Sequence, residues 1–111
     1  MRQAVIRGTA MTKFGRHLDR NLKDLGREAI SSALSDAGCE IDDLEAVYFS
    51  NSLAGLITGQ EAIRGQTVLH AMGVGTIPII NVENACASAG TALHMAWLSV
   101  ASGLHNTVLV V

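Results

Sequence analysis

The sequence is poor in charge and in residues that stiffen or cross-link a chain. Only 16% of its 111 residues are charged, one is proline and two are cysteine. Disordered chains combine high charge with low apolar content, whereas 49% of this chain is apolar. The length fits one domain of common size. We therefore predict one compact unit with a core of its own.

Neither sign of charge dominates, because 8 basic side chains face 10 acidic ones. A nucleic-acid or anionic-membrane partner normally leaves a basic excess, so we expect neither. No apolar run approaches the ~20 residues of a membrane span, and residues 1–8 lack the pattern of a secretory signal. These features predict a soluble, cytoplasmic protein.

Cysteine pairs and metal-ligand spacings are also absent from the sequence. Cys39 and Cys86 lie far apart, and the four histidines form no metal-binding pattern with them. We expect a reduced chain with no metal site.

The first half of the sequence predicts a strand and then a helix. Residues 4–8 are a β-prone run ending at a glycine, and a polar loop follows. From Leu22 to Ala37 apolar residues recur at spacings of three and four, which is typical of an amphipathic helix. Asn21 can cap this helix together with Asp24, and Gly38 can end it.

The second half alternates between strands and helices. We predict strands at residues 46–49, 77–82 and 108–111 and helices at 61–72 and 87–102, with a loop at 50–59. This order predicts an α/β class with a mostly parallel sheet and right-handed crossovers.

Two features of the last third of the chain stand out. The helix at 87–102 is apolar nearly all round, so we expect it to be buried on most sides. The sequence stops inside an apolar strand, which is unusual for a finished domain, so we expect a truncated one.

The best candidate site is the turn that joins the strand predicted at 77–82 to the apolar helix predicted at 87–102. Ligands of open α/β sheets collect at the carboxyl ends of the strands, and this turn carries Cys86. A cysteine at a helix start faces unpaired N–H groups and the positive end of the dipole, which favour the thiolate. The small residues around it let a substrate carbonyl approach backbone N–H groups that can stabilise an oxyanion.

Residue type and position leave a second interpretation of Cys86 open, in which it is a small buried hydrophobe, as free cysteines usually are. Cys39, beside the helix-ending Gly38, fits that description. His94 is no candidate base for Cys86, because it lies two helical turns away, roughly 12 Å along the axis. Glu83 and Asn84 precede Cys86, and a structural role in its loop is the favoured interpretation.

The residues around Cys86 resemble the nucleophile segment of the thiolase superfamily. The resemblance is strongest to the branch of sterol carrier protein X and related lipid-transfer or acetyl-CoA acetyltransferase proteins, and it covers the whole chain. It is carried by residues 11–16, by 36–38 with 41–44, and by Cys86 with the start of its helix. One departure is Ala89, which stands where the family commonly has glycine, with Gly90 one place later.

This resemblance implies an αβαβα layered fold of two similar halves, with the helix after Cys86 between two sheets. It implies that Cys86 accepts an acyl group from a coenzyme A thioester, which serves as substrate, in thiolysis or Claisen condensation. The activating histidine, a second cysteine and part of the oxyanion hole belong to a C-terminal half, so we expect residues 1–111 to be a partial N-terminal domain. The complete assembly is expected to be a homodimer or hetero-oligomer with no permanently bound cofactor. This chain alone is expected to accept an acyl group slowly and to be inactive in turnover.

Two other functions remain open at this point. One is a non-catalytic or docking subunit of a thiolase-like complex. The other is a ketoacyl-synthase-like condensing enzyme, which shares the fold and the cysteine at a helix start. The segment around Lys13 argues against the second.

Overall fold

A three-stranded parallel sheet forms the centre of the computed structural model, which describes residues 1–111. The strands are β1 (Ala46–Ser50), β2 (Ile79–Val82) and β3 (Val108–Val110), in the order β2-β1-β3. Val47 of the central strand β1 pairs with Ile79 on one side and Leu109 on the other. The predicted α/β class with a parallel sheet is confirmed.

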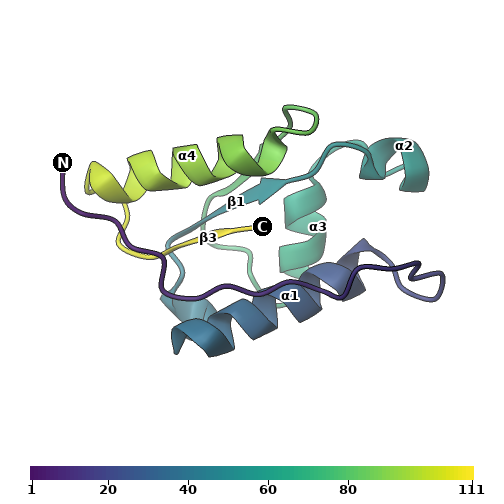
Figure 1. Ribbon diagram of the computed structural model, residues 1–111, viewed down its shortest axis with the longest axis horizontal. Coiled ribbons are helices and arrows are strands. Elements are labelled where there is room, and N and C mark those ends of the chain that lie inside the picture. The colour runs from purple at the N-terminus through teal and green to yellow at the C-terminus, as the bar shows by residue number, and fades with distance from the viewer.

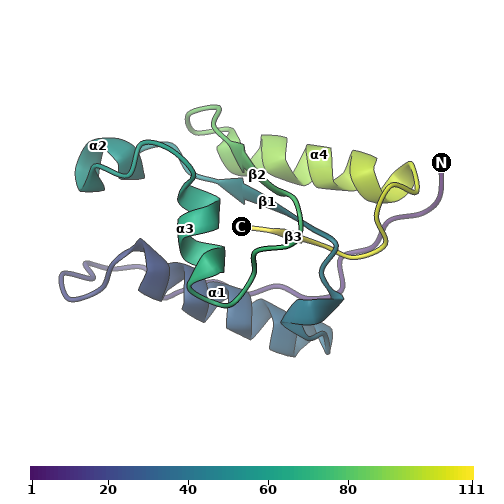
Figure 2. The same cartoon turned by 180° about the vertical axis from the view of Figure 1, so that it is seen from behind.

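Helices cover both faces of the sheet (Figures 1 and 2). On one face lie α1 (Leu22–Ala37) and α3 (Arg64–His70), and on the other lies α4 (Ser88–Ala101). A 3-10 turn at Ile41–Asp43 leads into β1, and the short α2 (Ala54–Thr58) follows it. These 111 residues therefore form three layers, helix, sheet and helix.

The alternation of side chains along β1 divides the core in two. Val47 and Phe49 face α1 and α3, where they join a cluster that includes Ile30, Val68 and Leu69. Ala46 and Tyr48 face the other way and pack with Ala92 and Ala96 of α4. All of these side chains are buried. The sheet is thus apolar on both faces, as a parallel sheet between helices requires.

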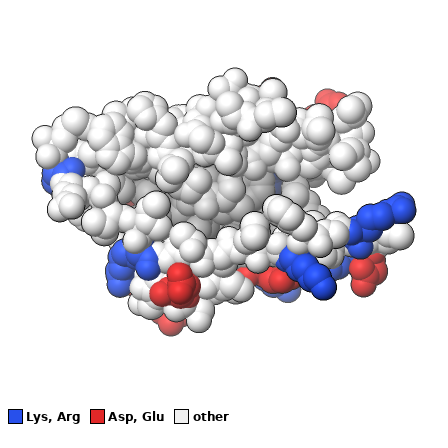
Figure 3. Space-filling view, in the orientation of Figure 1, with Lys and Arg blue, Asp and Glu red and all other residues white.

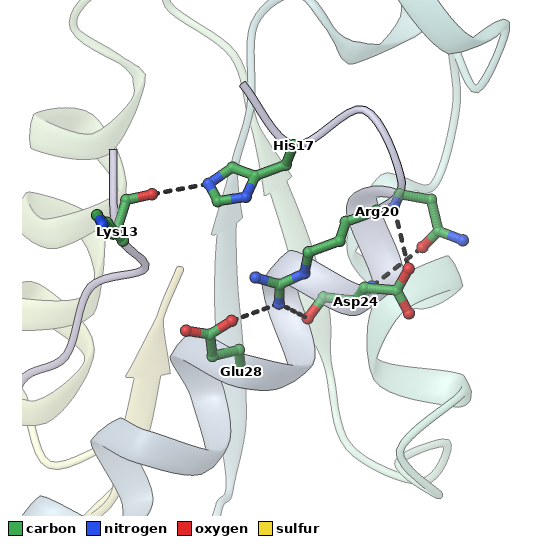
Figure 4. A network of polar contacts seen from close by, with 6 residues as sticks. Lys13, His17, Arg20, Asp24 and Glu28 are labelled. Carbon is green, nitrogen blue, oxygen red and sulfur yellow. Dashed lines mark hydrogen bonds and ion pairs between the residues drawn. The ribbon is translucent and has the colours of Figure 1, made fainter. Parts of the chain in front are cut away.

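The start of α1 is held by the capping box that the sequence predicts. Asn21 Oδ1 accepts the Asp24 N–H at 3.0 Å, and Asp24 Oδ2 accepts the Asn21 N–H at 3.0 Å. Arg20 donates to the Asp24 carbonyl at 3.2 Å and pairs with Glu28 (Figure 4). At the other end Gly38 has φ 63°, so the predicted left-handed C-terminal residue is confirmed.

Three predicted elements differ in the structure. No strand forms at residues 4–8, because this segment runs along α1 outside the sheet, with Arg7 bonded to the Ala37 carbonyl and the Thr9 N–H to Asp36. The predicted loop at 50–59 contains α2, and the helix expected at 61–72 is shorter, Arg64–His70.

The expectation that α4 is buried on most sides is wrong for this chain. Ala92 and Ala96 are buried against the sheet, but Leu93 is 49%, Trp97 45% and Leu98 42% exposed. Only one side of α4 has a sheet packed on it. Figure 3 shows that the surface over α4 in this view is almost free of charge, while charged side chains gather along α1. No helix of the chain is both long and apolar enough to span a membrane.

Candidate functional site

Cys86 lies in the turn that joins the carboxyl end of β2 to the start of α4. The strand ends at Val82 and the helix begins at Ser88, so five residues make the connection. The turn therefore lies at the carboxyl edge of the parallel sheet, which is where ligands bind in sheets of this kind. Cys86 is exposed and its thiol is free, so the interpretation as a buried hydrophobe is wrong for this residue.

The turn is braced by side chains on both sides of Cys86. Glu83 Oε2 accepts the Ala85 N–H at 2.6 Å. The Asn84 side-chain amide donates to Thr91 Oγ1 at 3.0 Å, which ties the turn to α4. The favoured structural role of Glu83 and Asn84 agrees with these contacts.

Ala85, directly before Cys86, has a left-handed backbone with φ 46°. Ser88 Oγ donates to the Ala85 carbonyl at 2.7 Å and accepts the Asn84 N–H at 2.8 Å. The sequence does not predict this conformation, because alanine has no preference for it. A serine in the first turn of a helix is the one signal that could have indicated a bracing role for Ser88.

Three backbone N–H groups at the start of α4 donate to no acceptor in the chain. They belong to Cys86, Ala89 and Gly90. Unpaired N–H groups at a helix N-terminus attract negative charge, and the helix dipole adds to this. The turn therefore offers a thiol and several free donors at one end of one helix.

The other cysteine has different surroundings. Cys39 follows the end of α1, is half-buried, and its Sγ lies 3.7 Å from the Ala37 carbonyl oxygen. The Cys86 turn, in contrast, begins at the carboxyl end of β2. Cys39 fits the expected role of a small packed side chain.

Two of the four histidines, His94 and His105, lie on or after α4 and contact other side chains. His94 stacks on Trp97, with ring centroids 5.9 Å apart. His105 Nδ1 lies 2.6 Å from Ser99 Oγ, beyond the far end of α4. The Cys86 turn therefore contains no general base from these rings.

A small cavity of about 120 Å³ opens at the carboxyl ends of β1 and β2. Arg64 reaches over it, donating to the Gln60 carbonyl at 2.8 Å and the Asn51 carbonyl at 3.1 Å. Glu83 lines this cavity and also braces the Cys86 turn. Cys86 itself does not line it, so the cavity does not enclose the thiol.

An ionisable group with a displaced pKa lies at the opposite end of β1. Hydrogen bonds from the Asn106 backbone N–H and from its side-chain amide lower the pKa of the Glu45 carboxyl from its ordinary value. This group is remote from the turn, so it bears on stability rather than on the chemistry of Cys86.

An α/β protein with an exposed cysteine and free N–H donors at a helix start is the class that the fold and site define. The sequence model of the family described as "Thiolase, N-terminal domain" matches residues 4–111. The chain therefore belongs to the thiolase family, and the resemblance predicted from the sequence is confirmed.

Curated relatives agree with this family. The chain is 43% identical over 109 residues to an acetyl-CoA acetyltransferase of Methanothermobacter thermautotrophicus, covering 98% of this chain and 28% of that protein. It is 38% identical to the benzoylsuccinyl-CoA thiolase subunit BbsB of Thauera aromatica, covering 97% and 27%. It is 34% identical to sterol carrier protein 2 of Gallus gallus, covering 97% and 19%. The chain thus spans less than a third of the length of these relatives.

Solved structures share the fold at lower sequence identity. A 3-oxoacyl-(acyl carrier protein) synthase III from Xanthomonas oryzae matches with a TM-score of 0.72 and 24% identity, covering 85% of this chain and 27% of that one. The synthase III from Aquifex aeolicus matches with a TM-score of 0.71 and 20% identity, covering 83% and 29%. These likenesses show the thiolase-like fold alone.

Proposed function

We propose that Cys86 is the acyl-accepting nucleophile of a thiolase-type acyltransferase. Its thiolate attacks the thioester carbonyl of an acyl-CoA, the carbonyl carbon to sulfur bond of CoA breaks, and CoA leaves as the thiolate. The product is an acyl thioester on Cys86, which splits one difficult step into two easier ones. The carrying observation is the exposed free Cys86 at the start of α4 beside unpaired N–H groups.

The backbone supplies the stabilisation that this step needs. In the tetrahedral intermediate the thioester oxygen becomes negatively charged, and N–H donors aimed at it lower the barrier. Ala89 and Gly90 have free N–H groups in the first turn after Cys86. Gly90 also leaves open space, since nothing lies within 4 Å of where its Cβ would be.

The second half-reaction needs groups that this chain does not place at the turn. Either a carbanion attacks the acyl-Cys86 thioester, or CoA does so in thiolysis, and both require proton transfer. Neither His94 nor His105 is available for it. We therefore propose that these 111 residues form the N-terminal part of a five-layered enzyme, the part that carries the nucleophile. A C-terminal half would supply the base and the acid. This cytoplasmic assembly would be a homodimer or hetero-oligomer.

The acylation half-reaction can be tested on this chain. Acetyl-CoA should release about one CoA per chain and then stop, because the acyl group has no acceptor. Cys86→Ala should abolish this release, and the matched variant Cys39→Ala should retain it. Equal CoA release from Cys86→Ala and the unaltered chain would contradict the assignment.

A docking subunit is the second candidate function. The apolar residues Leu93, Trp97 and Leu98 are exposed on α4, where a partner would bury them. In this function Cys86 is dispensable, so Cys86→Ala should leave the activity of a thiolase-like partner unchanged. The nucleophile function predicts loss of that activity instead.

The ketoacyl-synthase alternative has less support. Its members share the fold at 20–25% identity, whereas identity to the acetyl-CoA acetyltransferases is 43%. Supply of the acyl group from acyl carrier protein rather than from CoA would favour it.

A further inference from the structure

The backbone directly before Cys86 adopts a conformation that its residue type disfavours. Ala85 has φ 46°, in the left-handed region where an L side chain crowds the following carbonyl. Glycine would adopt it without penalty, but alanine needs surrounding contacts to hold it there. The presentation of Cys86 therefore depends on whatever holds Ala85.

Two side chains hold Ala85: Glu83 Oε2 accepts its N–H, and the Ser88 hydroxyl binds its carbonyl. Ser88 is 6% exposed, and its Oγ donates to the Ala85 carbonyl at 2.7 Å. The same oxygen accepts the N–H of Asn84 at 2.8 Å. One buried hydroxyl thus binds the carbonyl of Ala85 and the N–H of Asn84, and its removal leaves the Asn84 N–H without that acceptor.

We propose that Ser88 is a positioning residue for acyl transfer to Cys86. This inference rests on the proposed function, since it takes Cys86 as the acyl acceptor. Ser88 touches neither the thiol nor the acyl group in this reaction. It holds Ala85 left-handed and thereby fixes the thiol relative to the free N–H groups of Ala89 and Gly90.

Loss of this hydroxyl should slow the chemical step more than it weakens binding. Acyl transfer requires the thiolate and the oxyanion donors to meet one carbonyl group in one geometry, and small misplacements are costly. Recognition of the CoA portion does not depend on φ at Ala85. The maximal acylation rate should therefore fall while the half-saturating acetyl-CoA concentration stays the same.

The test compares three variants of the 111-residue chain. Ser88→Ala removes the hydroxyl, Ser88→Thr keeps it, and Ser99→Ala is the matched control. Ser99 is the other buried serine of α4, 5% exposed, and its hydroxyl bonds to His105 instead. Acylation of Cys86 by acetyl-CoA is followed by intact-mass spectrometry. Hydrogen exchange of the Asn84 backbone N–H with solvent is followed by NMR.

Ser88→Ala should lower the maximal acylation rate on the order of tenfold, the effect of losing roughly one hydrogen bond. It should also speed hydrogen exchange of the Asn84 backbone N–H with solvent. Ser88→Thr should restore both, and Ser99→Ala should change neither. If Ser88→Ala unfolds, the double variant Ser88→Ala with Ala85→Gly takes its place, because glycine holds a positive φ without support. The comparison is then with a second double variant, Ser88→Thr with Ala85→Pro, in which proline excludes a positive φ at residue 85. The glycine-containing double variant should be acylated faster than the proline-containing one.

The outcomes separate this inference from the proposed function. An unaltered chain that accepts no acyl group overturns the proposed function and the role of Ser88 with it. An unaltered chain that is acylated, with Ser88→Ala acylated equally fast, overturns Ser88 alone. An equal rate loss in Ser99→Ala also overturns it, because the effect would then be general destabilisation of α4.

Discussion

Gly26 of α1 and Val68 of α3 approach so closely that a Cβ on residue 26 would lie 2.6 Å from Val68 Cγ1. Both residues are buried on the same face of the sheet. Glycine costs a helix interior about 1 kcal/mol relative to alanine. At this position the close packing of α1 on α3 outweighs that cost.

Gly26→Ala should therefore destabilise the chain despite the better helix propensity of alanine. We expect a loss of about 1–3 kcal/mol in the free energy of unfolding, measured by urea denaturation, because the added methyl overpacks the contact. Gly90→Ala is the matched control, since its Cβ would meet nothing within 4 Å. A Gly26→Ala variant as stable as Gly90→Ala would contradict the packing of α1 on α3.

Ala92 tests the packing of α4 on the sheet. Its side chain is fully buried against Ala46 and Tyr48. Ala92→Leu should cost on the order of 1–3 kcal/mol through overpacking. Ala89→Leu makes the same change at an exposed position of α4 and should cost much less. Equal melting temperatures for the two variants would mean that α4 does not pack as described.

Glu45 should make stability depend on pH in the acid range. The Asn106 backbone N–H and then its side-chain amide lower the pKa of this carboxyl in the folded state. The stabilisation is therefore present above the ordinary pKa and is lost as pH falls through the lowered one.

Unfolding of Glu45→Gln, followed by urea titration between about pH 2 and pH 6, should show less of this acid-dependent loss. Glu61→Gln is the control, since the Glu61 carboxylate accepts no hydrogen bond from the chain and is exposed. An unchanged pH dependence in Glu45→Gln would refute the role of Asn106.

Cys86 should be alkylated faster than Cys39. Cys86 is exposed at a helix start, whereas Cys39 is half-buried with its Sγ near the Ala37 carbonyl. Brief treatment with iodoacetamide and peptide mapping gives the two rates in one sample. Faster labelling of Cys39 would show that the nucleophile has been assigned to the wrong cysteine.

The main elements of the fold could be predicted because local and tertiary preferences agree in them. The spacing of apolar residues and the pair Asn21 and Asp24 mark the start of α1, and Gly38 marks its end. The strands β1 and β3 were apparent as short apolar runs. Where a residue's own preference matches its surroundings, sequence patterns are reliable.

The differences have physical causes that a pattern does not contain. Residues 4–8 are β-prone, but a strand needs a neighbour in the sheet, and this segment lies against α1 instead. α2 begins where Asn51 Oδ1 accepts the Ala54 N–H at 2.9 Å, a local contact within a segment whose composition is typical of loops.

The candidate site also has one feature that the sequence predicts and one that it does not. The position of Cys86 at the carboxyl end of a strand could be predicted from the order of elements. Its bracing could not, because the left-handed Ala85 depends on a hydrogen bond from a serine three residues later. Apart from the serine in the first turn of the helix, no residue type in this segment indicates that geometry.

The location of the acyl group after exposure to acetyl-CoA tests the central claim most directly. The chain is incubated with acetyl-CoA, digested at acid pH to preserve thioesters, and mapped by mass spectrometry with and without hydroxylamine. We predict one hydroxylamine-labile acetyl group, on the peptide that contains Cys86, and none on the Cys39 peptide. A chain that carries no such group, or carries it on Cys39, would contradict the assignment of Cys86 as the acyl-accepting nucleophile.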